Sequence, residues 1–393
     1  MIANFSSGLD EGVNSRVTYL ANLLSNKADV ILVASDFSHL YKKHRDRNIK
    51  GFNFTIKMLH EIGYSKNVGL KRFISHFLWG IKVNNYLKSL TTKPDVIYAT
   101  VPSLTGAFFA SRFCVKNDVR FVIDIQDLWP EAFEMIVKIP IFTKLAFAPF
   151  KLIANKIYES ADCICAVSNT YCKRATKVNS SVSESKTIFL GNDLEEFDEN
   201  VKKNSDKIQK KQGEFWIGYC GTLGSSYDLK CAMDALEILS ISKKCKPTFV
   251  IMGDGPKMKE FVDYQKNLHI SCRFLGYINY EEMCGVLKKC DVAINPIMKG
   301  AAQSIINKHG DYAAAGIPVV SNQENVEYRE LVEEYNMGIN CKNSDAHAMA
   351  EALYFLINNE ELRIEMGKSA RKCAEEKFNR KTTYRELVEA ILL

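Results

Sequence analysis

The segment from Gln303 to Ser321, QSIINKHGDYAAAGIPVVS, constrains the fold of this chain more than any other stretch. The run DVAINP before it predicts a buried strand, and a polar loop containing Gly300 separates the two. We expect a helix that begins near Ser304 and ends at Gly316, since the alanine run favours helix and Pro318 prevents its continuation. The residues IPVVS then predict another buried strand. Strand, polar loop, helix, glycine and strand form an α/β unit whose ligand lies on the loop and the helix N-terminus.

Three polar side chains of this expected helix have the spacing of a binding site. Asn307 and Asp311 are separated by four positions and share one face, whereas Lys308 is turned about a quarter of the way round. A cation, a carboxylate and an amide beside free backbone N–H groups suit a ligand that carries both phosphate and hydroxyl groups. A nucleotide sugar is such a ligand.

This segment resembles the donor-site signature of retaining glycosyltransferases with the GT-B fold, family 4. That signature has two acidic residues with seven between them, then a small-residue run and G-x-P-V. In this chain the frame runs from Gln303 to Asp311 and continues as AAAGIPVV, so that glutamine and the shorter aspartate replace the usual glutamates. The form N-K-x-x-D-Y-x-A-A-G-x-P-V is similar to enzymes encoded in bacterial capsule and O-antigen clusters. The resemblance implies a role for each polar residue of this segment. Gln303 and the backbone from Ser304 to Asn307 would bind the hydroxyls of the sugar. Lys308 would bind the diphosphate, and Asp311 would bind the ribose.

Further glycine-bearing loops in the second half of the chain follow predicted strands. The string EFWIGYCGTLGSS places Gly221 and Thr222 in a loop suited to phosphate, and Gly253 lies in a turn that resembles the G-x-G-P turn of the family. Many relatives carry arginine at the position of Thr222 and a lysine about five residues later, and this chain lacks both cations. Gly276 and Tyr277 end another strand, where relatives hold the base and where Tyr277 either stacks on it or is structural. The resemblance implies that all five residues bind the donor.

The string FVIDIQDLWPEAF is the most informative feature of the first half. It predicts a strand with Asp124, Asp127 and Glu131 clustered at its carboxyl end, where α/β proteins bind ligands. D-L-W-P-E resembles the same position in the polysaccharide-cluster enzymes, although these often carry His-Asp where this chain has Gln126-Asp127. Asp127 is a candidate catalytic residue, as are Lys308 and Gln303 of the donor-site segment. Asp124 and Glu131 are candidates for the acceptor side. Asp127 as the cap of a helix is the alternative.

The N-terminal strand is followed by a glycine-containing loop and a helix expected to begin near Asn14. Gly12 in the loop and Arg16 in the first helical turn are candidate donor contacts, because a loop that enters a helix N-terminus can hold an anion. An arginine at such a position is otherwise a solvated surface residue.

Two helical stretches combine apolar spacing with lysine and arginine. Residues 69–87 place Leu70, Phe73, Ile74, Phe77, Leu78 and Ile81 on one face, and residues 132–158 mix phenylalanine and isoleucine with lysine. Such helices either pack on their own sheet or rest on a lipid surface, where lysine reaches anionic headgroups. For residues 69–87 we expect packing on the sheet, and for residues 132–158 both possibilities stay open.

Length and composition narrow the class of protein. A chain of 393 residues is too long for one ordinary domain. A net charge of +6 is too small for a nucleic-acid-binding protein of this size. The twelve cysteines are scattered without a C-x-x-C pair, which favours reduced thiols in the core over disulfides or a metal site. The sequence contains no run of about 18 apolar residues, which is the length that a membrane-spanning helix needs.

We therefore predict an α/β protein with GT-B architecture, in which two doubly wound Rossmann-like domains face each other across a cleft. Residues 1–200 would form the acceptor-binding domain and residues 201–378 the nucleotide-sugar-binding domain. The final helix, about 379–393, would pack back on the first domain, and the polar stretch 195–212 would be the interdomain linker.

The predicted function is that of a retaining glycosyltransferase. It would transfer a sugar from a nucleotide-sugar, with UDP preferred, to a saccharide or polyprenyl-diphosphate-linked acceptor in bacterial surface polysaccharide synthesis. We expect no cofactor and no metal requirement, no nucleic-acid partner, and a cytoplasmic protein in peripheral contact with the inner membrane face. Two alternatives remain: a UDP-sugar 2-epimerase of the same fold, and a non-catalytic nucleotide-sugar-binding partner of another transferase, which the replacements at Gln303 and Thr222 favour.

Overall fold

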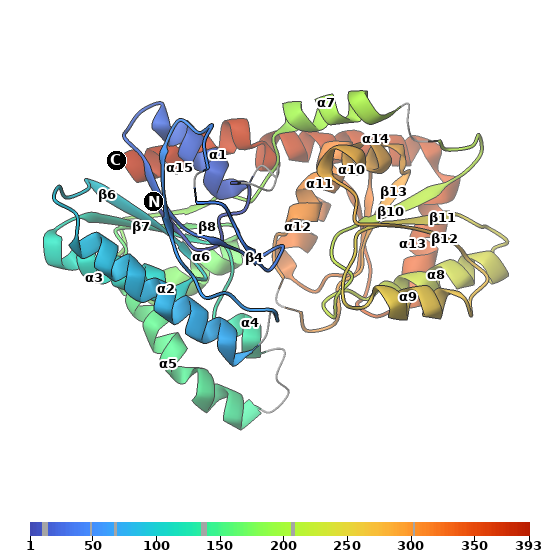
Figure 1. The fold of residues 1–393 in the computed structure, drawn as a ribbon. Coiled ribbons are helices and arrows are strands. Elements are labelled where there is room, and N and C mark those ends of the chain that lie inside the picture. The colour runs from blue at the N-terminus through green and yellow to red at the C-terminus, as the bar shows by residue number, and fades with distance from the viewer. Residues whose placement is uncertain (10–14, 48, 67–68, 135–139, 206–208, 302) are drawn as a thin grey trace. The chain divides into compact units, whose positions relative to one another are not determined.

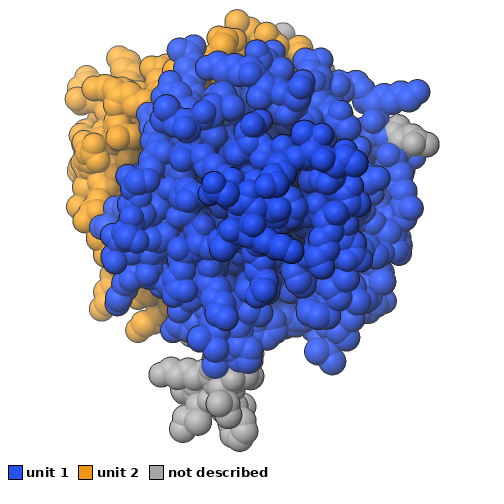
Figure 2. Space-filling model, turned by 90° about the vertical axis from the view of Figure 1, so that its left-hand side faces the viewer, with its two compact units in different colours: residues 1–189, 384–393 blue, residues 190–383 orange. Residues whose placement is uncertain are grey.

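The computed structural model describes residues 1–9, 15–47, 49–66, 69–134, 140–205, 209–301 and 303–393 (Figure 1). The chain divides into two compact units, which Figure 2 shows in separate colours. The first unit comprises residues 1–189 and 384–393, and the second comprises residues 190–383. Each unit is an α/β body built on its own parallel sheet.

The sheet of the first unit has the strand order β5-β2-β1-β6-β7-β8-β9, and all of its neighbouring strands are parallel. Its strands are β1 (Ile2–Ala3), β2 (Ile31–Ser35), β5 (Thr55–Leu59), β6 (Val96–Val101), β7 (Arg120–Ile125), β8 (Cys163–Ala166) and β9 (Glu184–Thr187). A small antiparallel hairpin, β3 (Phe37–Ser38) with β4 (Lys43–His44), follows β2. The strand order turns back between β1 and β6, which is the place where doubly wound sheets bind ligands.

Helices cover both faces of this sheet, with α2, α3 and α5 on one face and α1 and α15 on the other (Figure 1). They are α1 (Arg16–Ser25), α2 (Leu70–Lys88), α3 (Leu104–Asn117), α4 (Glu131–Glu134), α5 (Pro140–Glu159), α6 (Asn169–Thr176) and α15 (Arg380–Leu392). The end of α15 belongs to this unit because Tyr384, Leu387 and Ile391 pack in one core with Leu20 of α1 and Val122 of β7. The last helix therefore completes the hydrophobic core of the first unit.

The sheet of the second unit is also parallel throughout, with the order β12-β11-β10-β13-β14-β15. Its strands are β10 (Trp216–Cys220), β11 (Thr248–Met252), β12 (Ser271–Gly276), β13 (Val292–Asn295), β14 (Val319–Ser321) and β15 (Gly338–Asn340). Its helical segments are α7 (Leu194–Asn204), α8 (Leu229–Ser242), α9 (Met258–Gln265), α10 (Tyr280–Lys289), α11 (Asn307–Ala315), α12 (Val326–Glu334), α13 (Ala346–Asn358), α14 (Glu360–Cys373) and the π-helical turn η2 (Ala374–Phe378).

Strands β10 and β11 are buried along their whole length, which explains their continuous apolar sequences WIGYC and TFVIM. Most of the cysteine side chains also belong to the hydrophobic cores of the two units. All twelve cysteines are free, and all except Cys245 and Cys272 are buried, as expected for small side chains that belong to a hydrophobic core.

The predicted linker was wrong over most of its length, because α7 begins at Leu194. Asp193 caps this helix by accepting hydrogen bonds from the backbone N–H groups of Glu195 and Glu196, whose charges suit a helix N-terminus. Leu194 and Phe197 are buried, and α7 packs on α10. The polar composition that suggested a linker is the solvent face of an amphipathic helix.

The prediction that the apolar residues of α2 pack on the sheet was also wrong. Leu70, Ile74 and Phe77 are exposed by 75%, 44% and 51%, and Leu78 by 37%. The buried side of α2 instead carries Arg72, Ser75, His76, Trp79, Gly80, Val83 and Leu87. An apolar stripe therefore faces outward from this unit. None of the described helices is long and apolar enough to cross a membrane.

Candidate functional site

The strand order of the second unit turns back between β10 and β13, and the loops that follow these two strands meet at the carboxyl edge of the sheet. One loop contains Gly221 and Thr222, and the other leads through Gln303 to helix α11. Ligands of open α/β sheets bind in the crevice at such a reversal. The topology therefore brings the two predicted halves of the donor site together.

The loops after β10 and β11 pack backbone against backbone. Gly221 N–H donates to the Met252 carbonyl and Leu223 N–H to the Asp254 carbonyl, each at 2.9 Å. A Cβ atom added to Gly253 would lie 1.9 Å from the carbonyl oxygen of Gly221, so only glycine permits this approach. Gly253 thus shapes the loop that we predicted as a donor contact.

Helix α11 begins at Asn307, three residues later than the expected start near Ser304. The Gln323 amide donates to the carbonyls of Gln303 and Ser304 at 2.8 and 2.7 Å, which ties these residues to the loop after β14. The N-cap residue, Ile306, has no side-chain oxygen with which to satisfy the first-turn N–H groups. The end of the helix was predicted correctly, since Gly316 adopts the left-handed C-cap conformation at φ 64°.

Lys308 is the most unusual cation in the described part of the chain. The residue is 5% exposed, and its Nζ has no hydrogen-bond partner among the described residues. Nζ lies 4.0 Å from the ring centroid of Tyr219 and 3.8 Å from that of Tyr227, and a Cβ on Gly221 would be 3.0 Å from it. Burial lowers the pKa of Lys308 to about 7, although Cys220 and Asp311 act in the opposite direction. The ammonium group is held at the loop after β10 with its donors unused.

Asp311 lies one turn further along α11 and is 8% exposed. Its Oδ1 accepts a hydrogen bond from Asn192 Nδ2 at 2.5 Å and another from the Tyr280 hydroxyl at 3.3 Å. Burial raises the pKa of Asp311 to about 6, against the effect of these hydrogen bonds. Lys308 and Asp311 therefore place one cation and one carboxyl at the buried base of the predicted site.

The remaining predicted donor residues differ in their exposure. Thr222 and Asn307 are exposed, and Tyr277 is exposed by 63%, so that its ring is open to stacking. Gly276 has a φ of 67° and open space around it. Ser304 is buried and donates to Glu327 at 2.9 Å, and Gln303 has a buried Oε1 without a partner among the described residues. Gly12 lies outside the described residues.

The structure changes the interpretation of Arg16 and Asp124. Arg16 Nε and Nη2 each donate to the carboxylate of Asp124 at 2.8 Å, and Nη1 donates to the carbonyls of Ile188 and Phe189 at 3.0 Å. Both side chains are buried, and the guanidinium packs over the ring of Tyr384 at 4.9 Å. With these donors engaged inside the first unit, Arg16 and Asp124 form a structural ion pair rather than the predicted ligand contacts.

Replacing Arg16 with alanine should lower the free energy of unfolding by about 3 kcal/mol, because the buried Asp124 carboxylate would lose its partner. Urea unfolding measures this change. Replacement of Arg47, which is exposed by 59% in its own ion pair, is the matched control and should cost much less. An equally small effect at Arg16 would contradict the structural role.

Asp127 lies just past the carboxyl end of β7. Its Oδ1 accepts the Leu128 N–H at 2.9 Å and its Oδ2 the Trp129 Nε1–H at 3.3 Å. Burial raises the pKa of Asp127 to about 6, although the hydrogen bonds from Trp129 and Leu128 and the charge of Arg72 oppose the rise. A carboxyl with a pKa in this range at a sheet edge suits acid–base or hydroxyl-orienting chemistry.

Glu131 follows on α4 and pairs with Arg174, whose Nε donates to Oε1 at 2.6 Å. Its Oε2 is buried without a partner among the described residues. The structure therefore engages one oxygen of this predicted acceptor-side residue in an ion pair and leaves the other unused.

Sequence reasoning missed a cationic and aromatic cluster beside Asp127. Arg72 is 9% exposed and packs over the ring of Trp129 at 4.4 Å, while Lys42 lies over the ring of Tyr64 at 4.9 Å. His76 stacks on Trp129 with an interplanar angle of 4°, and burial with the charge of Arg72 lowers its pKa to about 3. The available signal was the helical spacing of Arg72, Ser75, His76 and Trp79, which forms a second stripe on α2.

Sequence comparisons find similarity to glycosyltransferases over part of this chain. Residues 200–373 match the family model described as glycosyl transferases group 1. The protein named uncharacterized glycosyltransferase MJ1069, from Methanocaldococcus jannaschii, is 21% identical over 244 residues. That alignment covers 62% of this chain and 61% of the relative, so the match spans less than two thirds of the relative's length.

Solved structures of similar fold cover almost the whole chain. Anabaena Alr3699/HepE in complex with UDP superposes with a TM-score of 0.70 at 15% identity, over 100% of this chain and 98% of that chain. Sucrose-phosphate synthase (tll1590) from Thermosynechococcus elongatus gives a TM-score of 0.70 at 14% identity, over 99% of both chains. Similarity at these identities concerns the fold alone, and it confirms the predicted GT-B class with two Rossmann-like halves.

Proposed function

We propose that this chain is a retaining, metal-independent glycosyltransferase of family 4 that uses a UDP-sugar as its donor. The observation that carries the proposal is Lys308, a buried ammonium group without a hydrogen-bond partner among the described residues, beside the glycine loop at the strand reversal. An uncompensated buried cation is costly, and a bound diphosphate supplies the missing negative charge. The neighbouring Anabaena protein has been crystallised with UDP and also with UDP-glucose, which supports UDP as the nucleotide.

Each part of the donor then has a partner in the second unit. Lys308 and the first-turn N–H groups of α11 bind the diphosphate, and the backbone of the Gly221 loop lies against it. Asp311 accepts ribose hydroxyls, and Gln303, whose Oε1 is unused, meets the sugar hydroxyls. Lys308 supplies the positive charge that relatives have in the loop after β10, since Thr222 and Tyr227 cannot neutralise phosphate.

The acceptor binds to the first unit beside Asp127, whose carboxylate orients the attacking hydroxyl. Arg72 and Lys42 make this edge of the sheet cationic, which suits an acceptor that carries phosphate, such as a polyprenyl-diphosphate-linked saccharide. Catalysis is then mainly the stabilisation of the departing diphosphate and the alignment of the acceptor on the same face of the sugar.

The exposed stripe of α2 supports peripheral contact with the inner face of the cell membrane. Leu70 and Phe77 are exposed, as is Leu152 of α5 at 63%. An apolar face of this kind inserts into the headgroup region of a bilayer. This contact would bring the enzyme to a lipid-linked acceptor used in capsule or O-antigen synthesis, as the motif resemblance suggests.

Thermal unfolding with nucleotides tests the donor site. UDP at about 100 times its dissociation constant should add about 2.7 kcal/mol of stability, and Asp311→Ala should remove this shift. Asp263→Ala, at a solvent-exposed Asp–Lys pair of the same unit, is the matched control and should keep the shift. An equal shift in the Asp311 variant would remove this residue from the site.

The same ligands separate the transferase from the alternatives. A transferase should slowly hydrolyse its sugar nucleotide without an acceptor, whereas a non-catalytic partner binds the donor without consuming it. An epimerase would instead change the configuration of the sugar and leave the nucleotide attached. Release of free UDP is therefore the discriminating measurement.

A further inference from the structure

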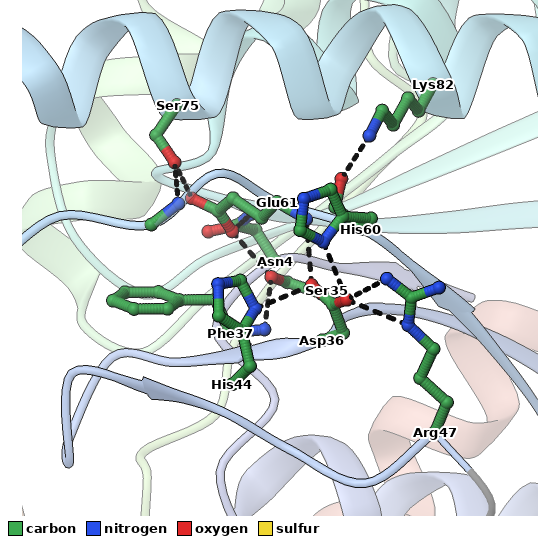
Figure 3. A network of polar contacts seen from close by, with 11 residues as sticks. Asn4, Ser35, Asp36, Phe37, His44, Arg47, His60, Glu61, Ser75 and Lys82 are labelled. Carbon is green, nitrogen blue, oxygen red and sulfur yellow. Dashed lines mark hydrogen bonds and ion pairs between the residues drawn. The ribbon is translucent and has the colours of Figure 1, made fainter.

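Three side chains that can ligate a metal converge at the carboxyl edge of the sheet in the first unit. Asp36 follows β2, His44 ends β4, and His60 follows β5 (Figure 3). Asp36 Oδ1 lies 3.4 Å from His44 Nδ1, and Asp36 Oδ2 lies 2.9 Å from His60 Nδ1. One ligand atom from each of the three residues lies within 4.8 Å of the others.

We propose that Asp36, His44 and His60 form a zinc-binding site. Zinc at about 2.0–2.1 Å from tetrahedral ligands places neighbouring ligand atoms roughly 3.3 Å apart. His44 Nδ1 lies at about this distance from Oδ1 of Asp36, and His60 Nδ1 lies slightly closer to Oδ2, so each imidazole faces a different oxygen of the carboxylate. Two imidazole nitrogens and one carboxylate oxygen are ligands that Zn²⁺ accepts, with water in the fourth position. The site is open to that water, since the side chains of His44 and His60 are exposed by 46% and 42%.

The surroundings hold the ligands in place. The Glu61 N–H donates to Asp36 Oδ1 at 2.8 Å, and Lys82 Nζ donates to the His60 carbonyl at 2.9 Å (Figure 3). The Asp36 carbonyl accepts the Arg45 N–H at 2.7 Å, which ties the hairpin that bears His44 to the sheet. A carboxylate that is held by an outer hydrogen bond, as Asp36 is, binds a metal more tightly than a mobile one.

Arg47 makes an ion pair with the carboxylate of Asp36. Its Nη2 and Nε donate to Asp36 Oδ2 at 2.6 and 3.0 Å, and its side chain is exposed by 59%. An exposed arginine can swing away, so it competes with a cation without blocking the site. Removing Arg47 should therefore strengthen zinc binding, whereas a purely structural network predicts no such gain.

The chemistry of this site is separate from the donor chemistry of Lys308, and the proposal does not depend on the function proposed above. A zinc ion here would fix the β3–β4 hairpin to the ends of β2 and β5. It would hold these loops of the first unit together.

Equilibrium dialysis of the untagged, chelator-treated full chain against Zn²⁺ tests the proposal. We expect one tightly bound equivalent, with an affinity reduced about 100-fold or more in His44→Gln and His60→Gln. His269→Gln is the matched control, because His269 makes a similar exposed pair with Glu237 at 3.0 Å without a third ligand. The His269→Gln control should bind zinc with the affinity of the native chain. The Arg47→Gln variant should bind zinc about tenfold more tightly.

Cobalt(II) distinguishes this site from binding by cysteine. Tetrahedral d–d bands without a thiolate charge-transfer band are expected, and they should disappear in His44→Gln. Absence of a bound equivalent in the native chain would overturn the proposal. So would zinc binding that survives both histidine substitutions, or cobalt spectra with a thiolate band.

Discussion

Replacing Lys308 with methionine is expected to lower kcat for sugar transfer about 10³-fold, because the departing diphosphate loses its buried cation. Methionine fills similar space between the rings of Tyr219 and Tyr227, so the packing there is preserved. Removal of an uncompensated buried charge should leave stability unchanged or raise it. Steady-state kinetics beside thermal unfolding measures the two effects separately.

The pH dependence of the native chain gives a second readout of Lys308. Its pKa in the folded chain is about 7, below the ordinary value of 10.5, so the unfolded chain binds more protons between these values. The free energy of unfolding should therefore rise with pH across this window, and Lys308→Met should remove that rise. Binding of a diphosphate favours the ammonium form, so the affinity for UDP should fall by up to about tenfold per pH unit above pH 7.

The control for this position is Lys299→Met, at an exposed lysine of the neighbouring loop. It should keep both the activity and the pH dependence of the native chain. Near-native kcat in Lys308→Met would remove this residue from the mechanism, and an unchanged pH dependence of UDP affinity would show that its charge does not meet the diphosphate.

The features predictable from the sequence were those determined by local chemistry. Gly316 ends α11 because glycine alone adopts the left-handed cap without strain, and the run WIGYC forms β10 because both faces of that strand are buried. The fold class followed from the alternation of such strands with helices. The sequence placed Lys308 on the helix after β13, whereas its contact with the Gly221 loop became visible only in the structure.

The errors arose where a side chain takes its role from a residue distant in sequence. Arg16 was predicted to contact the donor, but it pairs with Asp124, which lies 108 positions away along the chain. On α2 the apolar stripe was placed inward, whereas the buried side of the helix carries Arg72 and His76, which both pack on the ring of Trp129. Helical periodicity shows that a helix has two faces, and which face is buried depends on the polar partners available in the fold.

Replacing Asp127 with asparagine is expected to lower kcat about 10³-fold while leaving the donor KM and the UDP-induced thermal shift unchanged. The asparagine oxygen can still accept the Leu128 N–H, so the local turn is retained, but the charge that orients the acceptor hydroxyl is lost. Because the pKa of Asp127 is about 6, transfer by the native chain should fall as the pH drops below this value and the carboxylate is protonated. Asp118→Asn, at an exposed carboxylate of the same unit, is the control and should behave as the native chain does. If Asp127→Asn instead raised the donor KM at constant kcat, the carboxylate would belong to donor binding. The acceptor would then have to be oriented by another group, and Glu131, which has an unused buried oxygen, is the candidate.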